Sequence, residues 1–285
     1  MLKLINSDLK NKIKNILIKN PFGRILLIPY RLITPNNCVK SLKKRVRKYI
    51  FNSKEITNYT YDITELNKKY LLSFINIITK VDIKILEKYM KEIENDSVLM
   101  KHIEFTTLNS EYKNISDKVA KYGRRIGWYI FVRALKPKVV VETGIDKGLG
   151  SCVITAAIMK NKSEGCDGYY YGTDINPEAG FLFKPPYSDY GKILYGDSIN
   201  SLKALNKNID LFINDSDHSS EYEYNEYLTI KDKLSDKFLI ISDNAHCTDK
   251  LHKFANENGF KYLFFKEEPL NHWYPGAGIG AAFKE

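Results

Sequence analysis

A glycine-rich turn after an apolar strand is the first place in this sequence where residue types and spacing could do chemistry. The run 139–141 is all valine, a carboxylate closes it, and a helix-compatible segment begins at residue 151. Glycines allow a tight turn against a ligand, and a helix start offers unpaired N–H groups. The spacing is neither that of a P-loop nor Gly-x-Gly-x-x-Gly. We expect a nucleotide-type pocket, or else a turn without ligand, built from Glu142, Thr143, Gly144, Gly148, Gly150 and Ser151.

Acidic residues stand at or near the end of each strand that the pattern predicts. The strands are expected at 138–142, 169–174, 192–196, 210–215 and 238–243, with helices between them. In an open parallel sheet the ligand crevice lies outside the carboxyl ends of the strands. Acids gathered on one rim repel each other unless a cation or a hydroxyl-rich ligand lies among them.

Two of these strand ends suit a nucleoside. Asp174, which closes the second strand, is spaced to accept hydrogen bonds from ribose hydroxyls. Asp197 and Ser198 follow the third strand and could contact an adenine edge. For all three residues the alternative is a local role, as caps of the turn or helix that follows.

Over about residues 116–285 these motifs together resemble class I S-adenosylmethionine (SAM) methyltransferases. The segment 210–221 is similar to the strand-four motif of cation-dependent O-methyltransferases, which include the caffeoyl-CoA type and bacterial sugar enzymes of the macrocin and aminocoumarin kind. The resemblance implies SAM as cofactor. It also implies a divalent metal, Mg²⁺ or Mn²⁺, held by Asp215, Asp243 and Asn244. The caffeoyl-CoA type tends to have lysine where this chain has His218, so its precise mechanism is not carried over.

The physical argument agrees with a metal at this rim. Strands four and five of such a sheet are neighbours, so Asp215 and Asp243 would converge, and oxygen ligands suit Mg²⁺ or Mn²⁺. Such an ion lowers the pKa of a bound hydroxyl. Asp217 and His218 are the candidate general bases, with Asp217 narrowly preferred. Their alternatives are a helix cap and a packed loop histidine.

Several residues are expected on the acceptor side. An insertion at 181–190 is interpreted as a mobile lid or acceptor loop, with an ordered surface insertion as the alternative. The acceptor-side candidates, each of which could instead simply pack its loop, are Tyr187, His246, His272, Trp273 and Tyr274.

The fold class expected is α/β: a Rossmann-like class I methyltransferase sheet, mostly parallel with an antiparallel last strand, and a helical N-terminal extension. The pattern divides the chain into a basic arm (1–54), a helical cap or linker region (55–115) and the methyltransferase domain (116–285). Within these we expect a helix over 63–95 that breaks near 80–82, and another over 116–135. The tail, from 262 onward, predicts a terminal strand pair.

The arm carries most of the charge. Residues 1–54 hold 14 Lys and Arg against one acid, Asp8, so the arm has a net charge of +13 and the remainder −3. Apolar residues recur at helical spacing over 7–19 and 38–51. The pattern is typical of a helix on an anionic membrane surface, and equally of a cap or homo-oligomer helix with solvated lysines. Nucleic acid is disfavoured because no aromatic stacking pattern accompanies the charge. Neither a signal peptide nor an 18-residue apolar run is evident, which predicts a cytoplasmic protein, peripheral at the inner membrane face if the arm binds lipid.

The function expected is metal-assisted O-methylation of a sugar or polysaccharide hydroxyl, as in a lipid-linked glycan. The alternatives are a metal-independent methyltransferase of protein, RNA or a small metabolite, a non-catalytic SAM- or nucleotide-binding scaffold, and an NAD enzyme, which the glycine order disfavours.

Overall fold

The computed structural model describes residues 7–56 and 59–284, and these divide into two compact units. The smaller unit contains the chain up to Asn52 together with Asn271–Trp273. The larger unit contains Ser53–Leu270 and Tyr274–Glu285.

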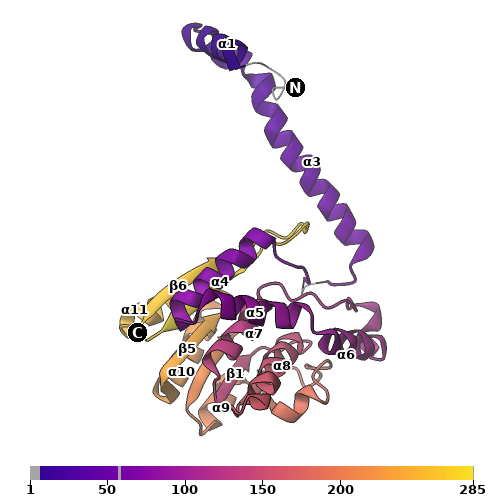
Figure 1. The fold of residues 1–285 in the computed structure, drawn as a ribbon, viewed down its shortest axis with the longest axis vertical. Coiled ribbons are helices and arrows are strands. Elements are labelled where there is room, and N and C mark those ends of the chain that lie inside the picture. Colours follow the sequence, from indigo (N-terminus) through magenta and orange to yellow (C-terminus); the bar gives the residue numbers. More distant parts are fainter. Residues whose placement is uncertain (1–6, 57–58, 285) are drawn as a thin grey trace. The chain divides into compact units, whose positions relative to one another are not determined.

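A seven-stranded sheet with the order β3-β2-β1-β4-β5-β7-β6 forms the centre of the larger unit (Figure 1). The first five strands are parallel to one another, and β7 is antiparallel to both β5 and β6. The strand order reverses between β1 and β4, where open α/β sheets bind ligands. This is the expected fold class and it is confirmed. The strands are β1 (Val139–Thr143), β2 (Tyr169–Asp174), β3 (Gly191–Tyr195), β4 (Ile209–Asn214), β5 (Leu234–Ser242), β6 (Lys261–Lys266) and β7 (Gly278–Phe283).

Helices cover both faces of the sheet because successive strand residues point to opposite sides. Val140 packs into one apolar cluster and Val141 into the other. The first cluster joins the sheet to α4 (Glu65–Thr79), α5 (Ile83–Glu94), α6 (Ser97–Leu108), α7 (Arg125–Leu135) and α8 (Leu149–Ser163). The second joins it to α9 (Ser198–Ala204), α10 (Ser220–Ile230) and α11 (Lys250–Glu257). Short 3₁₀ turns lie at η2 (Glu111–Asn114), η3 (Tyr187–Tyr190) and η4 (Lys231–Lys233).

The break between α4 and α5 is where the sequence predicts it. Lys80 ends α4 in a left-handed conformation (φ +60°), and Asp82 caps α5 by accepting a hydrogen bond from the Lys84 amide (2.8 Å). Thr64 caps the start of α4 in the same way, by accepting from the Asn67 amide (3.3 Å). Each helix therefore begins on a side-chain oxygen that satisfies an otherwise unpaired amide.

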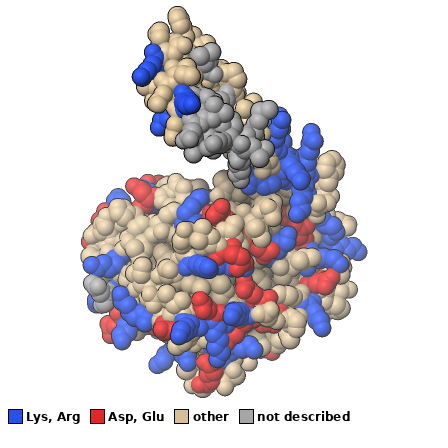
Figure 2. Space-filling model, turned by 45° about the horizontal axis from the view of Figure 1, so that its top comes forward, with Lys and Arg blue, Asp and Glu red and all other residues tan. Residues whose placement is uncertain are grey.

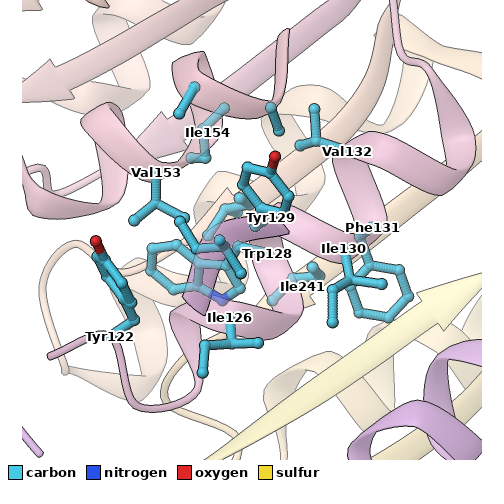
Figure 3. Packing of buried hydrophobic residues seen from close by; sticks show 14 of the residues in the cluster. Tyr122, Ile126, Trp128, Tyr129, Ile130, Phe131, Val132, Val153, Ile154 and Ile241 are labelled. Carbon is cyan, nitrogen blue, oxygen red and sulfur yellow. The ribbon is translucent and has the colours of Figure 1, made fainter. Parts of the chain in front are cut away.

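The helix predicted over 116–135 is wrong in its first half. The helix α7 begins only at Arg125, because Gly123 turns the chain with φ +52°. Before that turn, Asp117 accepts hydrogen bonds from Ser53 Oγ (2.7 Å) and the Lys54 amide (2.8 Å). These bonds hold the segment against residues that are distant in the sequence. What remains of the helix is buried all round, from Ile126 to Val132, where it packs against α4, α5 and α8 (Figure 3).

The smaller unit is helical. The helix expected over 7–19 is present as α1 (Ser7–Lys19), and a short α2 (Gly23–Leu26) follows it. A single long helix, α3 (Ile28–Asn52), includes the region 38–51 and contains Pro35. Residues 1–6 of the predicted arm lie outside the described residues.

Arg133 fastens α7 to its neighbours through a buried ion-pair network. Its guanidinium donates to Glu92 of α5 (2.9 Å) and to Glu164 beyond α8 (2.6 Å), and also to Asn161 Oδ1. It lies over the ring of Tyr89, 4.5 Å from the centroid. The side chain is 1% exposed, and its loss leaves the buried Asn161 Oδ1 and the partly exposed carboxylates of Glu92 and Glu164 without this donor.

We predict that Arg133→Met lowers the free energy of unfolding by about 2 kcal/mol, because the buried Asn161 Oδ1 loses a donor and two partly exposed carboxylates lose their ion pairs. The matched control is Lys136→Met, whose half-exposed ammonium lies 3.4 Å from the same Glu164 and contributes at most about 0.5 kcal/mol. Urea unfolding at pH 7 measures both. Equal stability of the two variants would contradict the assignment of Arg133 as the fastener.

Candidate active site

Two cavities open at the carboxyl edge of the sheet, and they adjoin. The first, which we call the strand-end cavity, measures 530 Å³ and follows β2, β3 and β4. The second, the tyrosine cavity, measures 320 Å³ and is bordered by Tyr59, Tyr61 and Tyr274. Both include the residues Gly144, Asp146, Asp215 and His218 in their walls. A ligand in one cavity therefore meets a ligand in the other at this shared wall.

The position of Gly144 in the shared wall has no room for a side chain. Its φ is +78°, and a Cβ there would lie 2.0 Å from the carbonyl oxygen of Asp215. The Gly144 amide donates to Thr173 O (2.9 Å), and the Asp215 amide donates to Thr143 O (2.9 Å). The turn after β1 is thus fastened to the ends of both neighbouring strands. Gly148, at φ +85°, then starts α8.

Asp174, Asp197 and Ser198 lie where a nucleoside would be expected, in the wall of the strand-end cavity. Asp174 accepts from the Asp146 amide (2.9 Å) and from the Asn176 amide (2.9 Å), so its position is fixed by the glycine loop. Asp197 caps α9 through the Asn200 amide (2.8 Å) and also accepts from Tyr222 Oη (2.8 Å). Capping and cavity lining thus coexist in Asp197.

Four of the predicted pocket residues form a buried frame under the glycine loop. Glu142, Thr143, Gly150 and Ser151 line neither cavity and are almost fully buried. Glu142 accepts from Tyr170 Oη and from Ser151 Oγ (3.3 Å), and a Cβ on Gly150 would collide with it. Burial raises the pKa of Glu142 to about 7, against an ordinary value of 4.5.

Asp215 and Asp243 converge as the sheet order requires, and two arginines lie against them. Arg124 donates to both carboxylate oxygens of Asp243, and Arg125 lies 3.7 Å from Asp215. Burial, together with the charge of Asp243, raises the pKa of Asp215 well above its usual range. Burial also opposes ionisation of Asp243, but the contact with Arg124 outweighs it and lowers the pKa of that carboxyl.

Arg124 is itself held by a second acid. Its amide donates to Glu267 Oε2 (3.1 Å), and its guanidinium lies 3.4 Å from both Glu267 Oε1 and Tyr61 Oη. Tyr61 in turn donates to Glu267. The cavity floor is therefore a network that joins the start of α7, the end of β5 and the β6–β7 connection.

The donor set at this rim is compatible with a divalent cation. At this rim the carboxyl groups of Asp215, Asp243 and Glu267 outnumber the two guanidiniums of Arg124 and Arg125 by one, and the raised pKa of Asp215 favours its neutral form in the absence of a further cation. Asn244 is fully buried, and neither its amide oxygen nor its amide nitrogen has a hydrogen-bond partner. Among the described residues there is no group of three or more His, Cys, Asp or Glu side chains placed to hold a metal ion.

The two candidate bases differ in position. His218 borders both cavities, whereas Asp217 borders only the strand-end cavity and accepts from the Ser219 amide (2.8 Å). Only His218 therefore faces the place where ligands in the two cavities would meet. The choice of base between Asp217 and His218 stays a prediction.

The acceptor-side candidates divide into three outcomes. His246 and Tyr274 do line the tyrosine cavity, where Tyr274 Oη lies 3.4 Å from His246 Nε2. The prediction for Tyr187 is wrong, because its ring is 2% exposed and packs edge-on against His102 in the core. His272 and Trp273 belong to the smaller unit, where both rings pack around Tyr49. Their role as acceptor residues stays a prediction.

The insertion 181–190 is anchored. Leu182, Phe183 and Tyr187 are buried in the first cluster, and Leu182 O accepts from Cys152 Sγ (3.3 Å) and contacts His102 Nε2 (2.8 Å). The alternative of an ordered insertion describes it better than a lid.

Sequence reasoning missed Arg124, Arg125, Tyr61, Glu267 and the buried Glu226. Glu226 of α10 accepts from Thr143 Oγ1 (3.1 Å) and Ser216 Oγ (2.8 Å), so it supports the ends of β1 and β4 from below. Burial raises its pKa to about 7. A signal existed for Glu226 alone: it lies on the same helical face as Tyr227 and Ile230, which are both buried.

The comparisons with known proteins agree with this fold. Residues 141–245 match the family model of a methyltransferase domain. No curated protein matches the chain. The family match, together with the strand order, confirms the resemblance to class I methyltransferases.

Several solved structures are similar to the chain. One is a methyltransferase from Podospora anserina bound to S-adenosylhomocysteine, with 17% identity, coverage of 80% of this chain and 100% of that one, and a TM-score of 0.48. Another is an O-methyltransferase from Bacillus cereus in complex with the same molecule (12%, 74% and 100%, TM-score 0.48). A third is TomG, a tomaymycin-synthesis O-methyltransferase from Streptomyces achromogenes, in complex with SAM (12%, 67% and 90%, TM-score 0.47).

The buried frame predicts a pH dependence of stability. Because the pKa of folded Glu142 is about 7 and that of an unfolded glutamate near 4.5, the folded state holds an extra proton between these values. Stability is then lost as pH rises through this window. Glu142→Gln removes the loss, so the variant should gain on the order of 3 kcal/mol relative to the parent chain between pH 4.5 and 8.

Urea unfolding of both chains across this range measures the difference. Glu221→Gln, at a mostly exposed side chain, serves as the control and should follow the parent chain. If the curves for Glu142→Gln and the parent run parallel, Glu142 is not the group that holds the proton.

Proposed function

We propose that this chain is a class I SAM-dependent methyltransferase that transfers the methyl group of SAM to a hydroxyl oxygen of a sugar or polysaccharide. The observation that carries the proposal is the pair of adjoining cavities, which share Gly144, Asp146, Asp215 and His218. Methyl transfer needs a donor and an acceptor in line and in contact. Two cavities with a common wall suit that requirement.

The strand-end cavity suits the donor. In this proposal Asp174 accepts hydrogen bonds from the ribose hydroxyls, and Asp197 with Ser198 contacts the adenine edge. Gly144, whose close contact with the Asp215 backbone leaves no room for a side chain, would lie against the methionine part. Bound SAM supplies the methyl group as a sulfonium, and S-adenosylhomocysteine remains after transfer.

The proton of the acceptor hydroxyl must leave as the new oxygen–carbon bond forms. We assign its removal to His218, which borders both cavities, and retain Asp217 as the alternative base. In this proposal Tyr274 and His246 orient the acceptor.

A divalent cation, Mg²⁺ or Mn²⁺, is part of the proposal. Asp215, Asp243 and Asn244 would hold it, and the convergence of the two carboxyl groups next to the unpartnered Asn244 amide supports this. When bound, such an ion lowers the pKa of a coordinated hydroxyl.

The proposed acceptor follows from the walls of the tyrosine cavity. Tyrosine faces suit sugar rings, and the rings of Tyr59 and Tyr61 lie 5.4 and 5.9 Å from that of Tyr274. Acidic and basic side chains on the remaining wall suit vicinal hydroxyls. Release of S-adenosylhomocysteine in the presence of candidate polysaccharides tests this class of acceptor.

One observation favours a second candidate, a metal-independent methyltransferase of a small metabolite. Arg124 already contacts both carboxylate oxygens of Asp243, which places a cation on a predicted metal ligand. In this alternative the two arginines alone neutralise the acids.

The donor site makes a direct prediction for SAM binding. Asp174→Asn keeps the size of the side chain but removes the charged acceptor, so SAM affinity should fall about 10- to 100-fold. Isothermal titration calorimetry with SAM measures it. Asp189→Asn, at an exposed position of η3, is the matched control and should bind as the parent does. Undiminished affinity of Asp174→Asn would move the ribose away from the end of β2.

The metal site makes a prediction that needs no acceptor. The full chain should bind one Mn²⁺ in an electron paramagnetic resonance titration, and Asp215→Asn should weaken binding at least about ten-fold because it removes a carboxylate ligand. Asp232→Asn, at an exposed position, is the control. If the parent chain binds no Mn²⁺ and EDTA leaves methyl transfer intact, the metal-independent candidate replaces this one.

A further inference from the structure

The long helix α3 carries an apolar stripe that is open to solvent. Along its 25 residues, apolar side chains recur at helical spacing on one face, at Ile28, Leu32, Val39, Leu42, Val46 and Ile50. All but Val46 are more than 40% exposed, which leaves most of the stripe uncovered. Exposed apolar residues aligned in this way mark a surface that binds something.

The rest of the same helix is basic. Between Ile28 and Asn52 there are seven Lys and Arg and no acid, and most of them lie off the apolar stripe. On the visible face of the smaller unit, Lys and Arg stand without Asp or Glu among them, whereas on the larger unit both signs are mixed (Figure 2). The helix thus combines two features, an apolar face and a uniformly positive remainder.

These two features together select one class of partner. A second copy of the chain would cover the stripe, but it would bring a second segment of charge +13 against the first. Nucleic acid would neutralise the charge but leave the apolar stripe uncovered. The surface of an anionic bilayer does both, because acyl chains receive the stripe while headgroups pair with the lysines.

We propose that α3 lies in the plane of an anionic membrane surface, with its apolar stripe among the lipid chains. None of the helices in the described ranges has the length and apolar character that crossing a bilayer requires. The attachment is therefore interfacial and salt-sensitive, as expected for a basic amphipathic helix. This inference is independent of the reaction proposed above.

Vesicle flotation of the full chain tests the proposal. The chain should float with phosphatidylcholine vesicles that contain about 30% phosphatidylglycerol, and should stay behind with pure phosphatidylcholine or in about 0.5 M salt. Leu32→Ser combined with Val39→Ser should weaken binding at least about ten-fold, because it removes two side chains from the stripe.

The matched control is Ile33→Ser combined with Phe51→Ser, which removes two exposed apolar side chains from the opposite, basic side of α3. Its binding should change less than about two-fold. If both double variants lose vesicle binding equally, the apolar stripe is not the contact surface. If the chain binds neutral vesicles equally well, an anionic surface is not required. If the chain does not bind vesicles but dimerises through the stripe, a second copy is the partner of this face. A chain that ignores vesicles but binds an RNA oligonucleotide with both double variants unchanged assigns it to nucleic acid. Each of these two results overturns the proposal.

Discussion

The contact between Arg124 and Asp243 is the interaction on which the candidate site depends. It brings the start of α7 against the end of β5, and Glu267 with Tyr61 extends it to the β6–β7 connection and to the segment before α4. Two buried acids that converge would repel each other and resist ionisation. The guanidinium allows Asp243 to remain charged, while the pKa of Asp215 stays high. The floor of the tyrosine cavity is thus an electrostatic compromise among groups from five separate parts of the chain.

The parts of this site that follow from local pattern were predictable from the sequence. The glycine turn, the strand-end acids and the break at Lys80 each depend on a few consecutive residues, whose spacing is itself the signal. Arg124 and Glu267 could not be found in this way, because they are 143 positions apart and nothing near either one predicts the other. The predicted helix 116–135 failed for the same reason, since Asp117 accepts hydrogen bonds from Ser53 and Lys54, which are more than 60 positions away. Tyr187 was misassigned because a loop sequence carries no sign of which aromatic rings it buries.

The two cavities differ in what builds them. The strand-end cavity is formed by the sheet and the turns directly after its strands. The tyrosine cavity takes Tyr59 and Tyr61 from the segment before α4, and Tyr274 from the β6–β7 connection. In the proposed reaction, the acceptor therefore meets residues that lie outside the strand-end motifs.

Tyr59 and Tyr61 also follow soon after the basic helix in the chain, and this gives the cavity wall a thermodynamic consequence. A molecule bound among the tyrosines fixes the segment that leads from α3 into the larger unit. A surface that binds α3 would restrict the same segment and so would act on the same equilibrium between its free and fixed states. By reciprocity, a surface that changed acceptor affinity through this segment would itself be bound more tightly, or less, by the same factor when acceptor is present. Binding of the acceptor and binding of a surface by α3 would then be coupled through this segment.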